Sequence, residues 1–147
     1  MTEHDLLEVV QIEHACALSK WGWDAYYSEL ANGALMMVAR LRYPDWKQNC
    51  LIKGFAAARL FSDQMHINNI GVRPEYQRCG IGRALLRAAL TTAYRAGARV
   101  AHLEVRPSNA GAIALYARHQ FRVVGRRPKY YVEPPEDALL MSAEIAG

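Results

Sequence analysis

The segment Val72–Arg83 constrains the fold of this chain more than any other part of its sequence. An extended apolar run stops at Pro74, a turn containing Gly80 and Gly82 follows, and a long helical pattern begins there. The first N–H groups of a helix have no partner within the helix and lie at the positive end of its dipole, so such a turn can bind a pyrophosphate. An ordinary strand–turn–helix connection would share this outline, and the residues around the two glycines decide between the two interpretations.

Those residues match a known motif. Gln77–Gly82 read Gln-Arg-Cys-Gly-Ile-Gly and resemble, at every defined position, the Gln/Arg-x-x-Gly-x-Gly/Ala motif with which GNAT acetyltransferases bind acyl-CoA. A second stretch, Leu103–Asn109 followed by Ala112–Tyr116, is similar to the RimI type, the branch that acetylates the N-terminal alanine of ribosomal proteins. The resemblance covers residues 5–145 and implies an acetyl-CoA-dependent N-acetyltransferase.

The resemblance implies the GNAT fold, an α/β fold whose central, mostly antiparallel twisted sheet splays at the cofactor cleft and is flanked by helices. The hydrophobic patterns agree with it. They predict helices at 5–17, 24–31, 80–97 and 109–118, and strands at 35–41, 52–61, 65–72, 100–105, 121–124 and 139–145. The link 42–51 is predicted to be a loop because it contains proline, aspartate and asparagine. Only residues 1–4 remain for the first edge strand of the family, which we expect to be short or missing.

Length and composition favour a single domain over residues 1–147. The chain has no linker-like segment and no internal repeat, and its 52% hydrophobic and 22% charged residues are typical of soluble globular proteins. No apolar run approaches the roughly 18 residues that span a bilayer, and the polar start is unlike a signal peptide. Three widely spaced cysteines favour neither a disulfide framework nor a zinc site. We expect a cytoplasmic protein without membrane contact.

The net charge of +4 raises the question of nucleic-acid binding. Many arginines lie near the two motifs, where the phosphates of a cofactor and solvated helix faces account for them. The sequence has no recognition-helix motif and no basic strand with interleaved aromatic residues, so we expect no direct nucleic-acid binding. The histidines do not have metal-ligand spacing, and we expect no metal. The oligomeric state stays open.

The resemblance assigns acetyl-CoA to the residues around the first motif. The backbone amides of the turn would bind its pyrophosphate; these residues are Arg78, Cys79, Gly80, Ile81, Gly82 and Arg83. The backbone of Ile70, Gly71 and Val72 would pair with the pantetheine arm as a further strand does, although plain core packing is compatible with the same residues. Asn109 is a natural N-cap, and by resemblance it also contacts the cofactor.

Two residues of the second motif are catalytic candidates. The glutamate that matches Glu104 is the base that deprotonates the amine in RimI-type enzymes, and partial burial would raise its pKa. An α-amine has a pKa of about 8, so a carboxylate that acts directly or through water suffices. The tyrosine that matches Tyr116 protonates the departing thiolate in the family. The alternatives are a solvent-facing carboxylate and an aromatic ring packed in the core.

Three aromatic residues are candidates for binding the acceptor peptide: Trp23, Tyr130 and Tyr131. Trp23 is expected in the loop between the first two helices, and the tyrosine pair follows the strand at 121–124, as it does in RimI-type enzymes. Core packing is an equal alternative for either tyrosine. The neighbours of Trp23 depart from the family's Pro-Trp-Ser, which leaves the acceptor preference open.

The sequence therefore predicts acetyl transfer to a protein N-terminal amine, that of a ribosomal-protein alanine, by direct attack in a ternary complex. Three alternatives remain: acetylation of lysine side chains or a small amine, a ping-pong route through Cys79, and a non-catalytic acyl-CoA-binding module. The presence of Glu104 together with Tyr116 argues against the module, which needs only the phosphate-binding turn.

Overall fold

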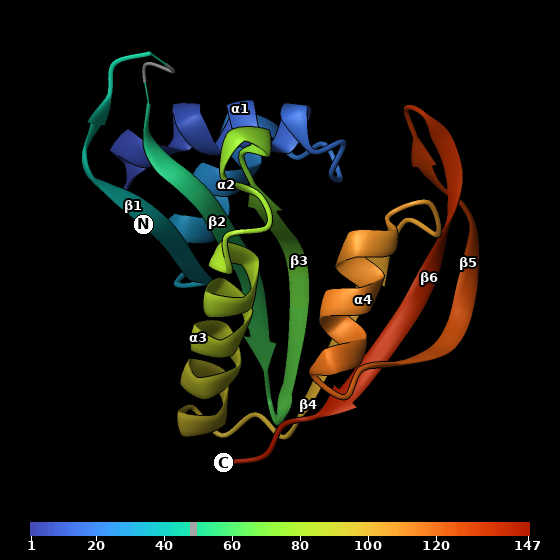
Figure 1. Ribbon diagram of the computed structural model, residues 1–147. Helices are drawn as coiled ribbons and strands as arrows, with labels where there is room; N and C mark the ends of the chain where they lie inside the picture. Colours follow the sequence, from blue (N-terminus) through green and yellow to red (C-terminus); the bar gives the residue numbers. More distant parts are fainter. Residues whose placement is uncertain (48–49) are drawn as a thin grey trace. The chain divides into compact units, whose positions relative to one another are not determined.

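The structure, a computed structural model, describes residues 1–47 and 50–147 (Figure 1). Helices and strands alternate in the second half of the chain, as the sequence predicts. The elements are η1 Glu3–Asp5, α1 Leu6–Ala15, α2 Gly22–Ala31, β1 Leu35–Asp45, β2 Cys50–Phe61, β3 Gln64–Val72, η2 Pro74–Tyr76, α3 Ile81–Arg95, β4 Val100–Val105, α4 Ala110–Arg118, β5 Arg122–Val132 and β6 Pro135–Glu144.

The strands form a six-stranded mixed sheet in the order β1-β2-β3-β4-β6-β5. The pairs β1–β2, β4–β6 and β5–β6 are antiparallel, whereas β3 and β4 run parallel from the pair Gln64–Val100 to the pair Ile67–Leu103. This α/β class with a mixed, mostly antiparallel sheet confirms the fold class that the sequence predicts. Among the described residues no strand precedes η1, so β1 lies at one edge of the sheet. The splay at a cofactor cleft stays a prediction.

The described chain divides into two compact units. The first comprises Met1–Ala58 and Asn69–Ala89, and the second comprises Arg59–Asn68 and Leu90–Gly147. The boundaries fall inside β2, β3 and α3 rather than in linkers. A single domain over residues 1–147 stays a prediction.

Both edge strands are longer than their sequence patterns predict. β1 and β5 run through Pro44 and Pro128, respectively. Proline removes a hydrogen-bond donor from the ladder, and an edge strand tolerates this because one of its sides has no strand to pair with. The predicted loop at 42–51 is therefore wrong at both ends, because 42–45 belong to β1 and 50–51 belong to β2. Its positions 48 and 49 lie outside the described residues.

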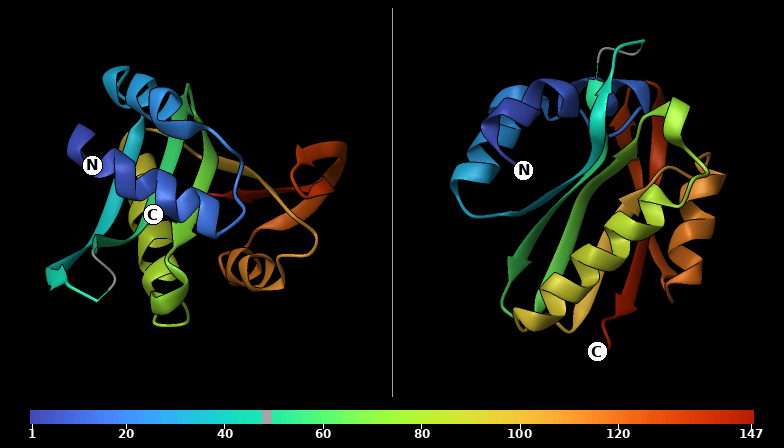
Figure 2. Two further views of the ribbon diagram at one scale, coloured as in Figure 1. Left: turned by 90° about the horizontal axis from the view of Figure 1, so that it is seen from above. Right: turned by 60° about the vertical axis from the view of Figure 1, so that its left-hand side comes forward.

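In the first unit, α1 and α2 pack on β1 and β2 (Figure 2). Leu6, Val9 and Ile12 of α1 recur at helical spacing and are fully buried. Tyr26 of α2 meets Phe55 of β2 edge to face, with ring centroids 5.6 Å apart. The hydrophobic faces that the sequence pattern of these helices predicts thus form the core of this unit.

Two glycines allow backbones of the first unit to approach closely. A Cβ at Gly54 of β2 would lie 2.6 Å from the carbonyl oxygen of Gly71 in β3 and 3.3 Å from Leu85 of α3. A Cβ at Gly71 would lie 2.9 Å from both Ile12 and Leu18. Gly71 therefore has a packing role that is independent of any ligand.

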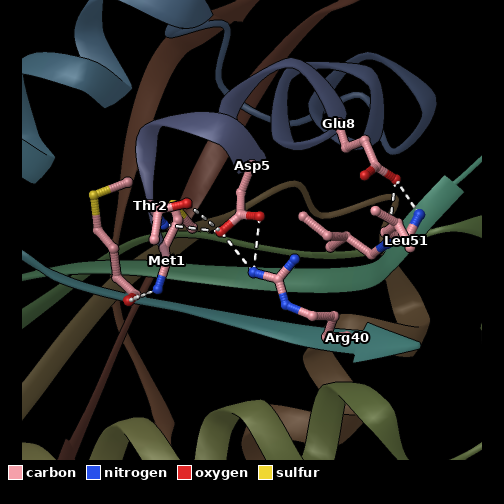
Figure 3. A network of polar contacts seen from close by, with 8 residues as sticks. Met1, Thr2, Asp5, Glu8, Arg40 and Leu51 are labelled. Atoms are coloured by element: carbon pink, nitrogen blue, oxygen red, sulfur yellow. Dashed lines mark hydrogen bonds and ion pairs between the residues drawn. The ribbon is translucent and has the colours of Figure 1, made fainter. Parts of the chain in front are cut away.

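A buried carboxylate ties the N-terminal turn to β1 (Figure 3). The oxygens of Asp5 accept hydrogen bonds from one Arg40 nitrogen at 2.8 and 2.9 Å, and one of them accepts from the N–H of Thr2 at 2.8 Å. Burial would raise the pKa of Asp5, but these hydrogen bonds and the charge of Arg40 outweigh it, and the pKa is lowered. Asp5 is therefore a stabilising anion at neutral pH.

A second carboxylate, Glu8 of α1, binds the start of β2. Its Oε1 accepts from the N–H groups of Leu51 and Ile52 at 2.8 and 3.1 Å (Figure 3), and from Arg73 at 2.9 Å. Arg73 also donates through Nε to the carbonyl oxygen of Ile52 at 2.7 Å, and its N–H donates to that of Lys53 at 2.7 Å. The residue that follows β3 is thereby joined to both α1 and β2.

The second unit has a strictly alternating strand at its centre. Ala101, Leu103 and Val105 of β4 are buried, and the residues between them are half-buried. Tyr116 of α4 packs against Phe121, with ring centroids 5.7 Å apart. The alternation leaves every second side chain of β4 on a more open face.

We expect Gly54→Ala to lower the free energy of unfolding by about 1–3 kcal/mol, the usual cost of overpacking. The new Cβ would meet the backbone of Gly71, which cannot move aside as a side chain can. Gly111→Ala is the matched control, because its Cβ meets open space and alanine favours a helix over glycine. Chemical denaturation followed by circular dichroism measures both variants, and equal stabilities would contradict the close approach of β2 and β3.

Asp5→Asn should lower the free energy of unfolding by on the order of 2 kcal/mol at neutral pH, because it removes hydrogen bonds to a charged group. The pKa of Asp5 is lowered in the folded state, so its contribution is fully present above the unfolded pKa of about 3.9 and is lost as the pH falls through the lower folded pKa. Urea unfolding should therefore give curves for the wild type and this variant that converge in acid.

The control for this prediction is Glu3→Gln, which changes an exposed carboxylate in the same turn. We expect almost no effect from it. A difference between Asp5→Asn and the wild type that stays constant down to about pH 2 would show that the carboxylate charge is not the cause.

Candidate functional site

The predicted phosphate-binding turn begins with a fixed carbonyl group at the end of β3. The carbonyl oxygen of Val72 accepts hydrogen bonds from Gln77 Nε2 at 2.9 Å and from Cys16 Sγ at 3.1 Å. The N–H groups of Tyr76 and Gln77 donate to Arg73 and Pro74 and close the η2 turn. Gln77, the first residue of the motif, thus binds the turn to the end of β3.

The turn reaches α3 through left-handed backbone. Arg78 has a φ of +62° and Gly80 a φ of +83°. A Cβ at Gly80 would meet open space, so glycine is favoured there by its backbone conformation rather than by crowding. The first hydrogen bond of α3 that follows runs from the N–H of Ala84 to the oxygen of Gly80 at 3.0 Å. The N–H groups of residues 81–83 precede it and lie at the positive end of the helix.

The predicted cofactor-binding residues of the turn lie together and near the surface of the first unit. Arg78, Cys79, Gly80 and Arg83 are exposed, and Ile81 and Gly82 are half-buried. The Sγ of Cys79 donates to the carbonyl oxygen of Gln77 at 3.5 Å. On β3, Ile70 and Val72 are half-buried while Gly71 is buried. The turn therefore offers backbone amides and two exposed guanidinium groups to an anion.

In the second unit, Glu104 of β4 is held between two cationic or potentially cationic side chains. Its Oε2 lies 2.6 Å from Nε2 of His66 on β3, and its Oε1 lies 3.9 Å from Arg127 of β5. The side chain of Glu104 is 12% exposed, whereas that of His66 is 41% exposed. The parallel register, which pairs His66 with His102, brings the histidine to the carboxylate.

These neighbours correct an expectation from the sequence. Burial alone would raise the pKa of Glu104, as predicted, but the hydrogen bond and charge of His66 and the charge of Arg127 outweigh it. The pKa of Glu104 is lowered instead. The carboxylate is therefore ionised at neutral pH, and it is a weaker base than partial burial alone would make it.

Tyr116, the second catalytic candidate, lies in α4 and is 7% exposed. Burial raises its pKa to about 12. Its ring packs on Phe121. The phenol stays protonated at neutral pH and has a hydrogen bond to donate.

The tyrosine pair lies within β5, not after the strand as predicted. Burial raises the pKa of Tyr131, and the negative charge of Glu104 adds to this effect. Arg106 stacks over the Tyr131 ring at 4.1 Å. The Tyr130 ring lies perpendicular to that of Tyr131, with centroids 4.9 Å apart. The structure thus brings the two tyrosines of β5 and Arg106 together.

The loop between β4 and α4 is fixed to the turn between β5 and β6. Arg106 donates to the carbonyl oxygens of Pro134 and Glu133 at 2.8 and 3.2 Å. Glu136 accepts from the N–H and the hydroxyl of Ser108, each at 2.8 Å. These contacts set the position of β5, and hence of its tyrosines, relative to the start of α4.

Asn109 caps α4, as predicted. Its Oδ1 accepts from the N–H of Ala112 at 3.1 Å. This hydrogen bond satisfies one of the donors of the first turn of α4. A contact between Asn109 and the cofactor stays a prediction.

Trp23 lies in the first turn of α2 rather than in the preceding loop, which corrects the sequence prediction. The helix begins there because the buried carboxylate of Glu13 accepts hydrogen bonds from the N–H groups of Trp21 and Gly22. The Trp23 ring stacks on Tyr27 with centroids 4.9 Å apart, and both rings are exposed. The structure assigns no ligand to this exposed pair.

Sequence reasoning missed the partners of Glu104. His66 and Glu104 lie 38 residues apart, and only the register of two parallel strands brings them together. The sequence held only a weak indication that His66 lies on the same face as Glu104: His66 is a polar residue that alternates with buried residues along β3. Arg127 follows a stretch that the sequence predicts to be a strand. The side of the sheet on which its side chain lies depends on the pairing of β5 with β6, which the sequence does not show.

Two further findings concern residues 1–47 and 50–147 alone. No three histidine, cysteine, aspartate or glutamate side chains gather in a way that could hold a metal ion. No helix in this part of the chain is long and apolar enough to cross a membrane.

Comparison with known proteins identifies the family. The model of the Acetyltransferase (GNAT) family matches residues 6–121. The ribosomal protein bS18-alanine N-acetyltransferase of Salmonella typhimurium is 38% identical over 144 residues, which cover 97% of this chain and 93% of that protein. The crystal structure of the ribosomal-protein-S18-alanine N-acetyltransferase from Escherichia coli matches with a TM-score of 0.84 and 31% identity, over 100% of this chain and 92% of that one.

A third match concerns the fold. A Salmonella typhimurium protein solved with its cofactor acetyl-CoA has a TM-score of 0.77 at 20% identity, over 100% of this chain and 92% of that one. The family model covers well over half of the present chain, and the first relative covers nearly all of it. The enzyme class predicted from the motif is thereby confirmed, and the chain belongs to the GNAT family of acetyltransferases.

Proposed function

We propose that the protein transfers the acetyl group of acetyl-CoA to the α-amine of a protein N-terminus, and that its acceptor is the N-terminal alanine of ribosomal protein bS18. The names of the relatives from Salmonella typhimurium and Escherichia coli support this acceptor. The amine attacks the thioester directly in a ternary complex. A cytoplasmic location agrees with such a substrate.

The observation that carries the proposal is the ionised Glu104, held by His66 and Arg127. An α-amine with a pKa of about 8 already has a neutral fraction at neutral pH, whereas a lysine side chain with a pKa of about 10.4 has very little. Removal of a proton from an α-amine therefore needs only a mild acceptor. We therefore assign deprotonation of the amine to Glu104 and the side chains in contact with it.

The cofactor is assigned to the first unit. The amides of residues 78–83 receive the pyrophosphate, and the exposed guanidinium groups of Arg78 and Arg83 add positive charge. The backbone of Ile70–Val72 pairs with the pantetheine arm. The carbonyl oxygen of Val72 already accepts two hydrogen bonds, from Gln77 and Cys16, so Val72 contributes its N–H.

Tyr116 acts on the departing thiolate. A phenol with a pKa of about 12 remains protonated, but it is a much weaker acid than a thiol with a pKa of about 8.5. Tyr116 therefore stabilises the thiolate by donating a hydrogen bond, and solvent supplies the final proton. This is a smaller role than the full proton transfer expected from the sequence.

The acceptor residues are assigned to the two tyrosines of β5. Tyr130 lies against both Tyr131 and Arg127, and Arg127 lies 3.9 Å from Glu104. Aromatic rings with a polar tip suit the first residues of a peptide, because they contact backbone and small side chains alike. Trp23, in the first unit, is a further candidate for binding the acceptor peptide.

Acceptor specificity tests the proposal. We expect acetyl-CoA turnover with peptides that begin with free alanine, strongest with the N-terminal sequence of bS18, and at least tenfold lower kcat/KM with N-terminally blocked lysine peptides or polyamines. The physical reason is the lower pKa of the α-amine. Thiol release measures the rate, and mass spectrometry locates the acetyl group. Activity confined to lysine or polyamines would refute the N-terminal assignment.

Replacement of the two catalytic candidates tests the mechanism. Glu104→Gln should lower kcat about a hundredfold or more and leave the Kd for acetyl-CoA within about threefold. Tyr116→Phe should lower kcat by a smaller factor, about tenfold, because it removes one hydrogen bond. Glu144→Gln, an exposed carboxylate at the end of β6, is the control. Equal kcat values for Glu104→Gln and Glu144→Gln would remove Glu104 from the mechanism.

A further inference from the structure

The histidine bound to Glu104 has a second nitrogen that the structure leaves open. His66 Nε2 lies 2.6 Å from Glu104 Oε2, whereas Nδ1 has no hydrogen-bond partner among the described residues. With 41% of its side chain exposed, the ring can reach a ligand or solvent. Glu104 itself is mostly covered, so its partner is the more accessible of the two.

The carboxylate fixes the protonation of the ring. The pKa of Glu104 is lowered, so the group is ionised at neutral pH and can only accept a hydrogen bond. The proton between the two atoms must therefore belong to Nε2 of His66. In a neutral imidazole the other nitrogen then carries a lone pair. Nδ1 of His66 is a proton acceptor that faces away from the carboxylate.

We propose that Nδ1 of His66 takes the proton from the attacking amine, and that Glu104 is a positioning residue that orients the ring and stabilises its cation. This inference deepens the proposed function and rests on it. A neutral imidazole nitrogen with a free lone pair is the commonest general base in enzymes. A carboxylate whose pKa lies below its usual range is a poorer proton acceptor at that pH.

The proton and bond changes balance without a further reactant. As the nitrogen of the neutral amine forms a bond to the thioester carbonyl carbon, it gives one proton to Nδ1 of His66. The carbon–sulfur bond then breaks and the electron pair leaves with the sulfur. Glu104 stabilises the imidazolium while it exists. The imidazolium then releases its proton to solvent, and the thiolate takes up one proton from solvent. The products are an acetylated amine and the free thiol of CoA.

A second observation lies on the same strand. Nδ2 of Asn68 is buried and has no hydrogen-bond partner among the described residues. Asn68 is two residues after His66, so both side chains extend to the same side of β3. A buried donor without an acceptor is costly, and an oxygen atom of a bound substrate would satisfy it. The open acceptor of His66 and the open donor of Asn68 thus lie on one face, as expected where an amine and a carbonyl group bind.

The other groups around His66 do not offer the same chemistry. Arg127 is a cation that lies on the opposite oxygen of Glu104. His102, the register partner of His66 on β4, is engaged through Nδ1 with Ser142 Oγ at 3.0 Å. Tyr131 has its pKa raised above its usual range by burial and remains protonated. Of these side chains, His66 alone combines an open nitrogen with a carboxylate behind it.

The test compares two replacements of His66 with a matched control. In His66→Gln the amide nitrogen can still donate to Glu104, but the side chain cannot accept a proton. His66→Ala removes both functions, and His102→Gln changes the neighbouring histidine, which does not touch Glu104. We expect kcat to fall a hundredfold or more in both His66 variants and to stay within about threefold in His102→Gln. The Kd for acetyl-CoA should stay unchanged, and imidazole added to His66→Ala should restore part of kcat.

Wild-type kcat in His66→Gln would overturn the inference, because it would reduce His66 to a donor that positions Glu104. The comparison uses the best amine acceptor of the wild type. An enzyme that acetylates only lysine peptides would thus refute the N-terminal assignment and still test His66. Nitrogen NMR of the ring gives a readout that needs no turnover: we expect the neutral form to carry its proton on Nε2. A proton on Nδ1 would contradict the proposal.

Discussion

The turn after β3 depends on the way in which the end of that strand is held. Arg73 is bound to Glu8 of α1 and to two carbonyl groups of β2, and the carbonyl of Val72 is bound by Gln77 and Cys16. Both sets of contacts restrict the chain before it enters the left-handed residues of the turn. The amides at the start of α3 are therefore pre-organised, which reduces the entropy that binding of an anion would cost.

Each of the two units has its own chemistry. The first unit offers backbone amides, exposed arginines and a helix N-terminus, all of which favour an anion. The second unit holds the titratable groups, and its internal contacts fix their separation. Arg106 and Glu136 bind the β4–α4 loop to the β5–β6 turn, and Arg127 of β5 lies 3.9 Å from Glu104.

The sequence predicts the parts of this molecule that depend on local pattern. The Gln77–Gly82 motif, the caps and the spacing of apolar residues predict the turn, the helices and the central strands. The edge strands are underestimated because proline is a reliable breaker only inside a sheet. The prediction of a raised pKa for Glu104 fails for a different reason: it considers burial, which is local, and omits His66, which arrives through the register of β3 and β4. Contacts between parallel strands have no local signature.

Glu104 and Tyr116 lie in different environments, which shift their pKa values in opposite directions. Glu104 lies between a histidine and an arginine, and its pKa falls; Tyr116 lies in an apolar site, and its pKa rises to about 12. One group is thus fixed as an anion and the other as a neutral donor throughout the physiological range. Neither is then suited to exchange protons at neutral pH. Amine acetylation requires a proton acceptor, and the geometry leaves this role to Nδ1 of His66, the histidine whose other ring nitrogen contacts the anion.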